Sequence, residues 1–497
     1  MAYEVVVVGG GIGGLTTAAL LASRGVSVCL LERESQVGGC VAPFEKFGYT
    51  FENGAGLYAL WDQGEIHDRI FAELPVDPPK VRALDPACVV RLPDGSEIPV
   101  ASDNNAFHEI LSASFPECIT AALEFYSDAN RIGEALLRAI TRVPELLTAN
   151  SFQRLRAFWP SLRTAAEIRK RLNDTAAQHL ERSSLRFRRF IDAQLQLFGQ
   201  CSSEQCSYLY ACAILALRQH RLFAIKGGAA ALANMLVDAI RKSGGTIRLN
   251  ASALRLTCDG DGRATGVILL SGEAVAASRA VVSNLTIWDT YGKLIGLNNT
   301  PAEMRKQLKR LRGWGAYLVY LGIDEASARN LPGEHIIALT NMQPDRAFDP
   351  TTDQLALAVA PAWDPRAPTG KRSAIVQTFT DVDQWFAFHE DEQQHEAQDQ
   401  AMLEEVWRRL HSSIGELGNS IEIIETATPR TFYESTRRKL GMVGGIAHSS
   451  DDFLTHFPRH KTAIPNLFMV GDTTFPGPGV AAVTMSALIV ANEISKP

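Results

Sequence analysis

A glycine-rich turn between a β-branched run and an Ala/Leu-rich stretch constrains this chain most. Residues 4–8 read Glu-Val-Val-Val-Val, which is typical of a parallel strand buried on both faces. Gly9, Gly11 and Gly14 then fit the pattern GxGxxG at the start of a helix expected over residues 12–24. Gly9 permits a tight turn, Gly11 lets the backbone approach a pyrophosphate, and Gly14 lets the helix pack close to the sheet. The sequence therefore predicts a Rossmann-type βαβ unit.

A carboxylate after the next strand strengthens this prediction. Residues 26–31 are expected to form a second buried strand, and Glu32 follows it, about twenty residues after the glycines, where it can accept both hydroxyls of an adenosine ribose. Ile12 and Gly13 lie at the helix N-terminus, whose free N–H groups and positive dipole end favour phosphate. An ordinary glycine turn in an α/β fold explains the glycines but not the acid that follows.

Length and composition indicate two domains and limit the partners. A chain of 497 residues is too long for one compact core. Its 46% hydrophobic and 21% charged residues are typical of a soluble globular protein. The net charge of -6 gives no reason to expect nucleic acid as a partner.

The cysteines and the two ends of the chain bear on metal binding and location. The eight cysteines show no CxxC or Cys/His spacing, so we expect free buried thiols, no metal and a reducing compartment. The apolar start reads as a strand, not as a signal peptide, and the apolar stretch 480–491 is too short to span a bilayer. A cytoplasmic location follows as an expectation.

Two long segments resemble a known family. Residues 31–56 read LERESQVGGCVAPFEKFGYTFENGAG, and residues 466–494 read NLFMVGDTTFPGPGVAAVTMSALIVANEI. Both resemble the carotenoid desaturases and isomerases, the phytoene-dehydrogenase-related branch of the amine-oxidase-like flavoproteins. Residues 226–228 (Lys-Gly-Gly) and 428–432 (Thr-Pro-Arg-Thr-Phe) also match landmarks of that family. The resemblance is strong at both ends and in the middle piece of the nucleotide domain, and loose in between.

The resemblance implies FAD as the cofactor and a glutathione-reductase-type FAD domain of α/β class. The FAD domain is expected from residues 1–80, 221–289 and 426–497, and a substrate or cap domain of helices and a mixed sheet from residues 81–220 and 290–425. The expected cofactor-binding residues are Gly9, Gly11, Ile12, Gly13, Gly14, Glu32, Arg33, Gly38, Gly39, Asn53, Gly54, Ala55, Gly471, Asp472, Gly479 and Val480.

The C-terminal segment also has an interpretation from its residues alone. Asp472 follows an expected strand and can accept hydrogen bonds from the ribityl chain. Gly479 lets the backbone run against a flavin ring, and a helix from about Val480 points its N-terminus at the ring. Reduced flavin carries negative charge near N1 and O2, which a helix N-terminus stabilises. The alternative is a Gly/Pro turn before a terminal helix.

The expected reaction follows from the resemblance and from what the sequence lacks. The sequence contains no GxSxG motif, no HExxH motif and no histidines at ligand spacing. Most histidines are expected on the surface. We therefore assign no catalytic residue. The resemblance implies desaturation of a carotenoid by hydride transfer to flavin N5, with the 3',4'-desaturases most similar. Polyene conjugation stabilises the cation, so the protein mainly orients substrate and excludes water. A cis–trans carotene isomerase, a saturase or redox cyclase on another polyene, and a non-catalytic flavin carrier remain open alternatives.

A basic, aromatic stretch suggests a further partner. Residues 151–172 combine Phe152 and Trp159 with six arginines and lysines and one acid, Glu167, and basic character continues to about residue 190. Such a helix can lie on an anionic membrane surface on the cytoplasmic side, and the same pattern fits a solvated cap helix. Pro160 is expected to start a new helix. The oligomeric state is not predicted.

Overall fold

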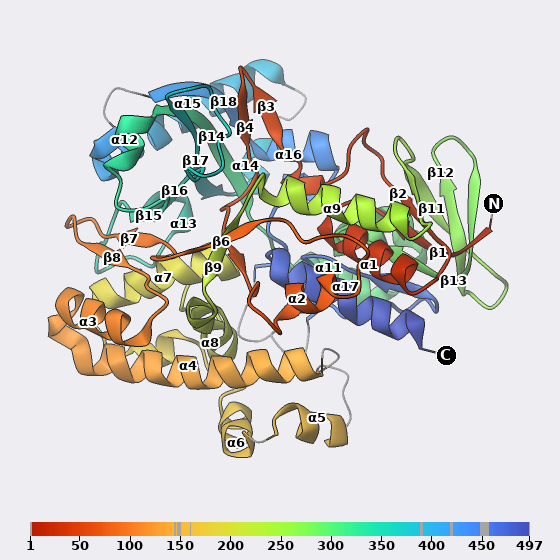
Figure 1. The fold of residues 1–497 in the computed structure, drawn as a ribbon, viewed down its shortest axis with the longest axis horizontal. Coiled ribbons are helices and arrows are strands. Elements are labelled where there is room, and N and C mark those ends of the chain that lie inside the picture. Colours follow the sequence, from red (N-terminus) through yellow and green to blue (C-terminus); the bar gives the residue numbers. More distant parts are fainter. Residues whose placement is uncertain are drawn as a thin grey trace.

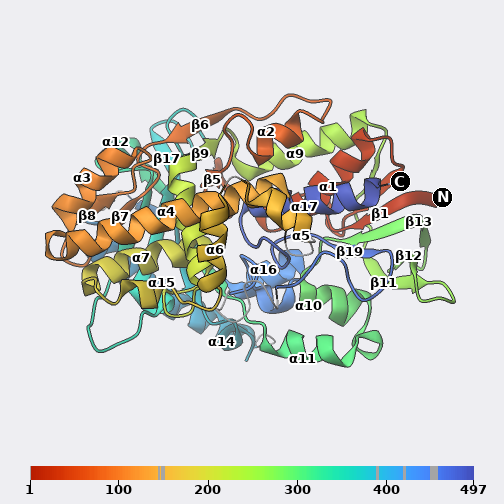
Figure 2. The ribbon, with the colours of Figure 1, turned by 90° about the horizontal axis from the view of Figure 1, so that it is seen from below.

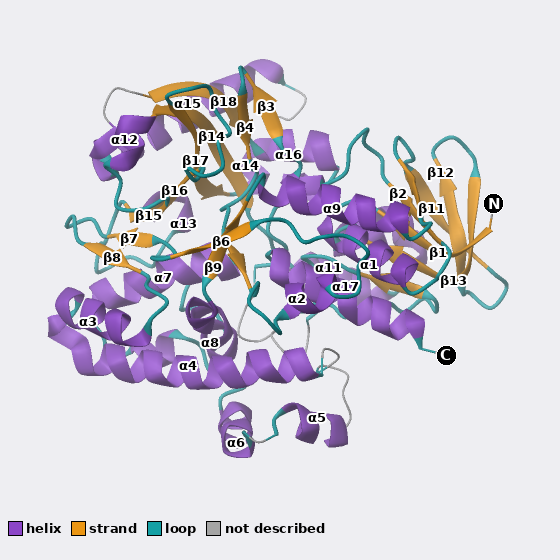
Figure 3. Cartoon of the chain, in the orientation of Figure 1, coloured by secondary structure: helices purple, strands orange, loops and turns teal. Residues whose placement is uncertain are grey.

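The computed structural model describes residues 2–143, 146, 151–159, 161–387, 391–417, 421–447 and 457–496. Two large sheets lie at opposite sides of the molecule, and helices cover both of them (Figures 1 and 3). The expected α/β class with a Rossmann-like unit and a second, mixed sheet is confirmed. The exact domain boundaries given above stay a prediction.

The first sheet contains the first and the last strand of the described chain. Its strands run in the order β10-β2-β1-β13-β12-β11, with β19 also paired to β13. The pairs of β1 with β2 and β13, of β2 with β10 and of β13 with β19 are parallel, and β11 and β12 are antiparallel additions. The strands are β1 (Ala2–Val8), β2 (Val28–Leu31), β10 (Thr246–Arg248), β11 (Ala253–Cys258), β12 (Ala264–Leu269), β13 (Ala274–Ser283) and β19 (Leu467–Met469).

Strand β1 is buried on both faces, as its run of valines predicts. Val5 and Val7 contact helices α1 (Ile12–Ser23), α9 (Gly228–Lys242) and α17 (Val480–Ser495) in one core cluster. Val6 and Val8 face a second cluster on the other side, because successive side chains of a strand alternate between faces. The layer order is therefore helices, sheet, and a smaller apolar layer that includes α10 (Ile287–Asp289).

The second sheet follows the order β18-β14-β17-β16-β15-β7-β8 and is antiparallel except for the pair β15 with β7. Along β14, Tyr317 and Val319 face α15, whereas Leu318 and Tyr320 face an aromatic cluster that includes Phe51. The elements are β7 (Val89–Arg91), β8 (Glu97–Pro99), β14 (Gly315–Asp324), β15 (His335–Leu339), β16 (Gln354–Val359), β17 (Lys371–Thr380), β18 (Ile421–Ala427) and α15 (Glu392–Ser413).

A layer of helices closes the side of the molecule between the sheets. It consists of α3 (Asn104–Ser114), α4 (Ile119–Arg142), α7 (Leu185–Gly199) and α8 (Tyr208–Ala216). Two short helices, α5 (Ser151–Ala157) and α6 (Leu162–Lys170), lie outside α4 and away from the body (Figures 1 and 2). Pro160, expected to start a helix, is outside the described residues.

The remaining strands and helices connect these layers. They are β3 (Phe44–Lys46), β4 (Tyr49–Phe51), β5 (Tyr58–Ala59), β6 (Val81–Leu84), β9 (Leu222–Ile225), α2 (Ile66–Phe71), α11 (Ala302–Arg310), α12 (Glu325–Arg329), α13 (Pro350–Asp353), α14 (Val382–Phe386) and α16 (Pro429–Thr436).

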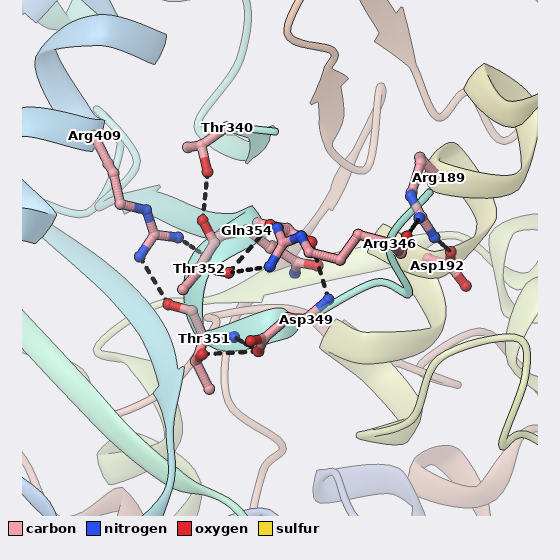
Figure 4. Close-up of polar contacts among 10 residues, drawn as sticks. Arg189, Asp192, Thr340, Arg346, Asp349, Thr351, Thr352, Gln354 and Arg409 are labelled. Carbon is pink, nitrogen blue, oxygen red and sulfur yellow. Dashed lines mark hydrogen bonds and ion pairs between the residues drawn. The ribbon is translucent and has the colours of Figure 1, made fainter. Parts of the chain in front are cut away.

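A buried polar network joins helix α7 to the second sheet (Figure 4). Arg189 pairs with Asp192 at 3.0 Å and donates to the carbonyl of Arg346 at 2.6 Å. Asp192 also accepts from the backbone N–H of Ser203 at 2.7 Å, just after the helix ends. Paired and hydrogen-bonded charges of this kind tolerate burial. The network therefore fixes the C-terminal end of α7.

Two expectations about burial are wrong in part. All eight cysteines are free, but only five are buried: Cys40 and Cys118 are partly exposed, and Cys258 is exposed because it ends an outer strand of the first sheet. His67 and His335 are buried, and burial lowers the pKa of each imidazole to about 4, so both are neutral near pH 7.

Candidate functional site

One cavity of about 980 Å³ connects the first sheet, the second sheet and the helical layer. Every residue predicted above to bind the cofactor lines it except Gly14. One end is polar and rich in glycine, and the other is apolar; we call them the glycine end and the apolar end. The two ends come from different parts of the chain and are described in turn.

The glycine turn leaves the N-terminus of helix α1 open to the cavity. Gly9 has φ +101°, a conformation that favours glycine, and Gly11 caps α1 without any side-chain hydrogen bond. The first N–H groups of α1 are therefore free to bind an anion. A Cβ atom at Gly14 would collide with the Gly9 carbonyl oxygen, so Gly14 allows the close packing of turn and helix without facing the cavity.

Glu32 lies beside this turn, at the end of β2. Its carboxylate accepts hydrogen bonds from the backbone N–H groups of Gly10 at 2.6 Å and Glu34 at 2.9 Å. The residue is 9% exposed and lines the cavity, so it is held rigidly with room for further acceptor contacts. Arg33 lines the cavity next to it and donates to the carbonyl of Ser435 at 3.0 Å.

The second glycine pair lies against the first turn. The N–H of Gly38 donates to the carbonyl of Gly10 at 2.9 Å, and Gly38 has φ +120°. A Cβ at Gly39 would lie 3.4 Å from the Cα of Gly11. Residues 9–11 and 38–39 thus form one glycine-lined wall with space for a bulky group.

The C-terminal segment completes the glycine end. Gly471 and Asp472 follow β19, and Gly479 has φ +91° at the N-terminus of α17, again without a side-chain cap. Val480 opens α17 and lines the cavity. Two helix N-termini, of α1 and α17, therefore face one cavity, an arrangement suited to the phosphates and the anionic ring of a dinucleotide.

Sequence reasoning missed two polar residues at this end. Arg438 donates from Nη2 to the Asp472 carboxylate at 2.8 Å and from Nε to the carbonyl of Met442 at 2.6 Å. Asn284 follows β13 and donates from Nδ2 to the Gly9 carbonyl at 3.4 Å, and a Cβ at Gly13 would lie 2.6 Å from its Oδ1. The position of Asn284 after a strand parallel to β1 could have revealed it, because strand ends of one parallel sheet share an edge. No comparable sequence pattern marks Arg438.

The stretch Glu52 to Ala55 is anchored by contacts from far along the chain. Glu52 accepts from Arg366 at 2.9 Å and from the Ala229 N–H at 3.0 Å. Asn53 accepts from the Tyr320 hydroxyl and donates to the Ala42 carbonyl at 2.9 Å, so its amide is engaged within the protein. The role of Asn53 is thus to hold the wall of the cavity, and Gly54 and Ala55 line the wall beside it.

The apolar end is built by the helical layer. Its walls come from α4, α7, α8 and the segment that follows α8, and they carry Leu137, Ile140, Leu197, Phe198, Ala213, Ile214 and Leu217. Tyr210 also lines this end, and burial raises the pKa of its phenol well above the ordinary value. No acid or base that titrates near pH 7 stands among these described residues. The apolar end therefore fits an elongated hydrocarbon, and these lining residues include no general base.

The residues of the glycine end fit a flavin dinucleotide. The glycine walls leave room that a Cβ would fill, Glu32 supplies an acceptor for ribose, and two uncapped helix ends face the phosphate and ring positions. Binding of the cofactor by each named residue stays a prediction.

Comparisons with known proteins agree with this geometry. The family model described as "Flavin containing amine oxidoreductase" matches residues 12–495. The chloroplastic prolycopene isomerase of Arabidopsis thaliana is 27% identical over 510 residues, which cover 99% of this chain and 82% of that protein. All-trans-retinol 13,14-reductase of Rattus norvegicus is 23% identical over 544 residues, covering 99% and 86%.

Solved structures share the fold. The crystal structure of an oxidoreductase from Methanosarcina mazei has a TM-score of 0.66 at 16% identity and covers 98% of this chain and 99% of its own. A redesigned putrescine oxidase has a TM-score of 0.66 at 13% identity, covering 99% and 98%. At these identities the likeness shows the fold alone.

Proposed function

We propose that this chain, which belongs to the flavin-containing amine oxidoreductase family, catalyses the cis–trans isomerisation of a long apolar polyene. It is an FAD-dependent oxidoreductase by that membership and by its similarity to oxidoreductases along the whole chain. The carotenoid desaturation expected from the sequence, 3',4'-desaturation above all, stays a prediction. The isomerase is the better supported of the two.

The observation that carries this proposal is the similarity to prolycopene isomerases over 99% of the chain. The cavity supports it, because its apolar end is continuous with the glycine end and carries no group that would remove a proton near pH 7. When bound, FAD supplies reversible electron transfer to a conjugated bond, so that the bond can rotate without net oxidation.

The protein's own residues then have three tasks. The helical layer binds the hydrocarbon through Leu137, Ile140 and Ile214 and excludes water from it. The anchored stretch from Glu52 to Ala55 keeps the cavity wall fixed where the two ends meet. Asp472, held by Arg438, keeps its carboxylate at the glycine end and away from the hydrocarbon.

The experiment compares product mass and spectrum under two redox conditions. A cis-polyene such as prolycopene is incubated anaerobically with the holoenzyme whose flavin has been reduced with dithionite, and separately with oxidised holoenzyme plus a quinone. We expect a product of unchanged mass and altered retention with reduced flavin alone. A product two hydrogens lighter that forms only with the quinone would establish the desaturase instead. A product two hydrogens heavier would indicate a saturase, the activity named in the retinol reductases.

We also propose that the α5–α6 projection (residues 151–159 and 161–172) rests on an anionic membrane surface. Phe152 and Trp159 are 74% and 61% exposed, and Leu155 and Leu172 are exposed as well. Exposed basic residues lie among them, and Glu167, the acid of the projection, is paired with Arg131 at 2.6 Å. These basic residues are Arg154, Arg156, Arg163, Arg169 and Lys170.

The projection is also connected to the apolar end of the cavity. Ala157 of α5 packs against Ala139 of α4 and Val143 just after it, and Leu137 and Ile140 of the same helix line the cavity. Within the described residues, no helix is both long enough and apolar enough to cross a bilayer. Interfacial docking through aromatic and basic side chains is therefore the mode of contact that we propose.

Vesicle sedimentation tests this surface. We expect Phe152→Ser with Trp159→Ser to lower binding to vesicles containing phosphatidylserine about tenfold, since both lost side chains bury apolar area in the interface. Phe47→Ser with Leu270→Ser is the matched control, because these residues are 74% and 70% exposed elsewhere on the molecule. Equal loss in both double variants would contradict the proposed surface.

A further inference from the structure

Gln200 occupies an unusual place between the two ends of the cavity. It follows α7 directly with φ 60° and ψ 29°, the left-handed conformation that glycine or asparagine usually supplies after a helix. A non-glycine residue in this region costs about 1 kcal/mol or more. Such strain persists only where surrounding contacts impose it, and it is common at functional sites.

Backbone contacts hold Gln200 in this conformation. The indole Nε1–H of Trp314 donates to its carbonyl at 3.1 Å, and its own N–H donates to the carbonyl of Gln196 at 3.1 Å. The ion pair of Arg189 with Asp192 (Figure 4) fixes the helix before Gln200, and the hydrogen bond from the Ser203 N–H to Asp192 fixes the chain after it. These contacts therefore fix the backbone from which the Gln200 side chain extends.

The side chain itself lines the cavity without a partner for its oxygen. Gln200 is 7% exposed, and its Oε1 is fully buried with no hydrogen-bond partner among the described residues. A buried polar atom without a partner costs about 1–3 kcal/mol, and most buried side-chain polar atoms in proteins are paired. Because the oxygen itself is closed off from the cavity, a rotation of the terminal amide about its last bond would present it there, and a bound molecule would then remove this cost.

The space around the carboxamide is made by glycine. A Cβ at Gly444, which has φ +72°, would collide with the Gln200 amide, and Gly444 also lines the cavity. The next residue, Gly445, packs against the Asp472 carbonyl, so this wall belongs to the glycine end. On the other side, Leu197 and Phe198 of α7 belong to the apolar end. Gln200 thus lies where the cofactor end and the hydrocarbon end meet.

We propose that the Gln200 carboxamide accepts a hydrogen bond from an N–H or O–H group of a molecule held in this cavity. The donor is either the imide N–H of the flavin ring or a hydroxyl on the polyene. The first source makes Gln200 a positioning residue for the cofactor. The second makes it a specificity residue that favours polyene alcohols over hydrocarbons. The inference rests on the proposed function for its choice of polyene probes.

Binding measurements distinguish the two sources without any turnover. The apoprotein is titrated with FAD, and the holoenzyme is titrated with retinol and with axerophthene, the hydrocarbon that lacks the retinol hydroxyl. We expect Gln200→Met, which keeps the length of the side chain, to weaken one of these contacts about tenfold. A weaker FAD complex assigns the donor to the flavin. Weaker binding of retinol with unchanged binding of axerophthene assigns it to the substrate hydroxyl.

Gln196→Met is the matched control. Gln196 lies one turn earlier on α7, is buried and has an unpaired Nε2, but it does not line the cavity. Gln200→Gly is a second variant that removes the carboxamide and relieves the backbone strain together, so it should fold at least as well as the native chain. Unchanged affinity for FAD and for retinol in both Gln200 variants would overturn the inference. Failure of the isomerase assay would leave these affinities unaffected, so the two proposals can fail separately.

Discussion

The two ends of the cavity are built in opposite ways. The glycine end is shaped by backbone: Gly9, Gly11 and Gly38 supply the turns, and two helices point uncapped N-termini into it. The apolar end is shaped by side chains that α4, α7 and α8 bring together. A backbone site accepts almost no change, because each Cβ would occupy ligand or protein space. A side-chain site can be resized one residue at a time.

This difference separates the fixed contacts that a cofactor requires from the adjustable contacts that select a substrate. Phosphate and ribose contacts depend on fixed donors and acceptors, which strands and helix ends provide. Contacts with a hydrocarbon depend on volume and shape, for which many side chains are equivalent. Four substitutions, in order of decreasing effect, test whether the two ends of the cavity differ in this way.

The largest effect is expected from Gly14→Val at the glycine end. The added side chain would collide with the Gly9 carbonyl oxygen and separate the turn from α1, so FAD binding should be lost. Flavin absorbance of the purified protein measures this. Gly260→Ala is the control, because nothing lies within 4 Å of a Cβ there, and it should bind FAD normally. Retention of FAD by Gly14→Val would refute the backbone account.

Glu32→Gln should weaken FAD binding about 10- to 100-fold, the usual cost of losing a charged hydrogen-bond acceptor. The loss should appear in the dissociation constant from flavin fluorescence. Glu45→Gln, which changes an exposed carboxylate outside the cavity, should bind within about twofold of the native protein. Equal affinities of the two variants would show that Glu32 only stabilises the turn.

Ala213→Phe at the apolar end should raise KM for the polyene about tenfold while the FAD dissociation constant stays unchanged. Ala213 lines the cavity, and the ring would occupy volume otherwise open to substrate. Steady-state kinetics and FAD titration of the same preparation give both numbers. A parallel loss of FAD would mean that the two ends are not independent.

The smallest effect concerns a contact that joins the helical layer, which builds the apolar end, to the segment just before α2. His220 bonds to Glu65 at 2.5 Å and to Glu134 of α4 at 2.6 Å. Burial lowers its pKa, but the two carboxylates outweigh burial and raise the pKa to about 9. The pKa of His220 in the folded protein lies above the unfolded value of about 6.5. The free energy that this contact adds to folding is therefore fully present below about pH 6.5, and it is lost as the pH rises through about 9.

His220→Gln should therefore lower Tm by about 1–2 °C near pH 7 and by less near pH 10. Thermal unfolding of both proteins across this range measures the difference. A Tm difference that does not change with pH would show that the imidazole acts through packing alone.

The sequence predicted the glycine end far better than the apolar end. The turn at Gly9, the acid at Glu32 and the helix from Val480 are local signals, since each depends on residues close together in the chain. The helix and strand bounds near them agree with expectation within two residues. Arg438 could not be found, because its contact with Asp472 depends on how distant segments pack.

The strained Gln200 shows a second limit. A glutamine after a helix gives no sequence signal of a left-handed conformation. Trp314, which holds its carbonyl, and Gly444, which leaves space for its amide, both lie more than a hundred residues away in the chain. The helical layer likewise reads only as amphipathic helices, and which faces line a cavity depends on their packing.

Strand β19 lies in the first sheet and helix α17 packs against that sheet, and this arrangement has a consequence during protein synthesis. The strand next to β13 and one of the two helix ends that face the cavity are contributed by residues 467–495, so the pocket has an open side until the ribosome has translated almost the whole described chain. A nascent or prematurely terminated polypeptide lacks that wall. The site that we expect to hold the coenzyme is therefore complete only after residues 467–495 have been synthesised.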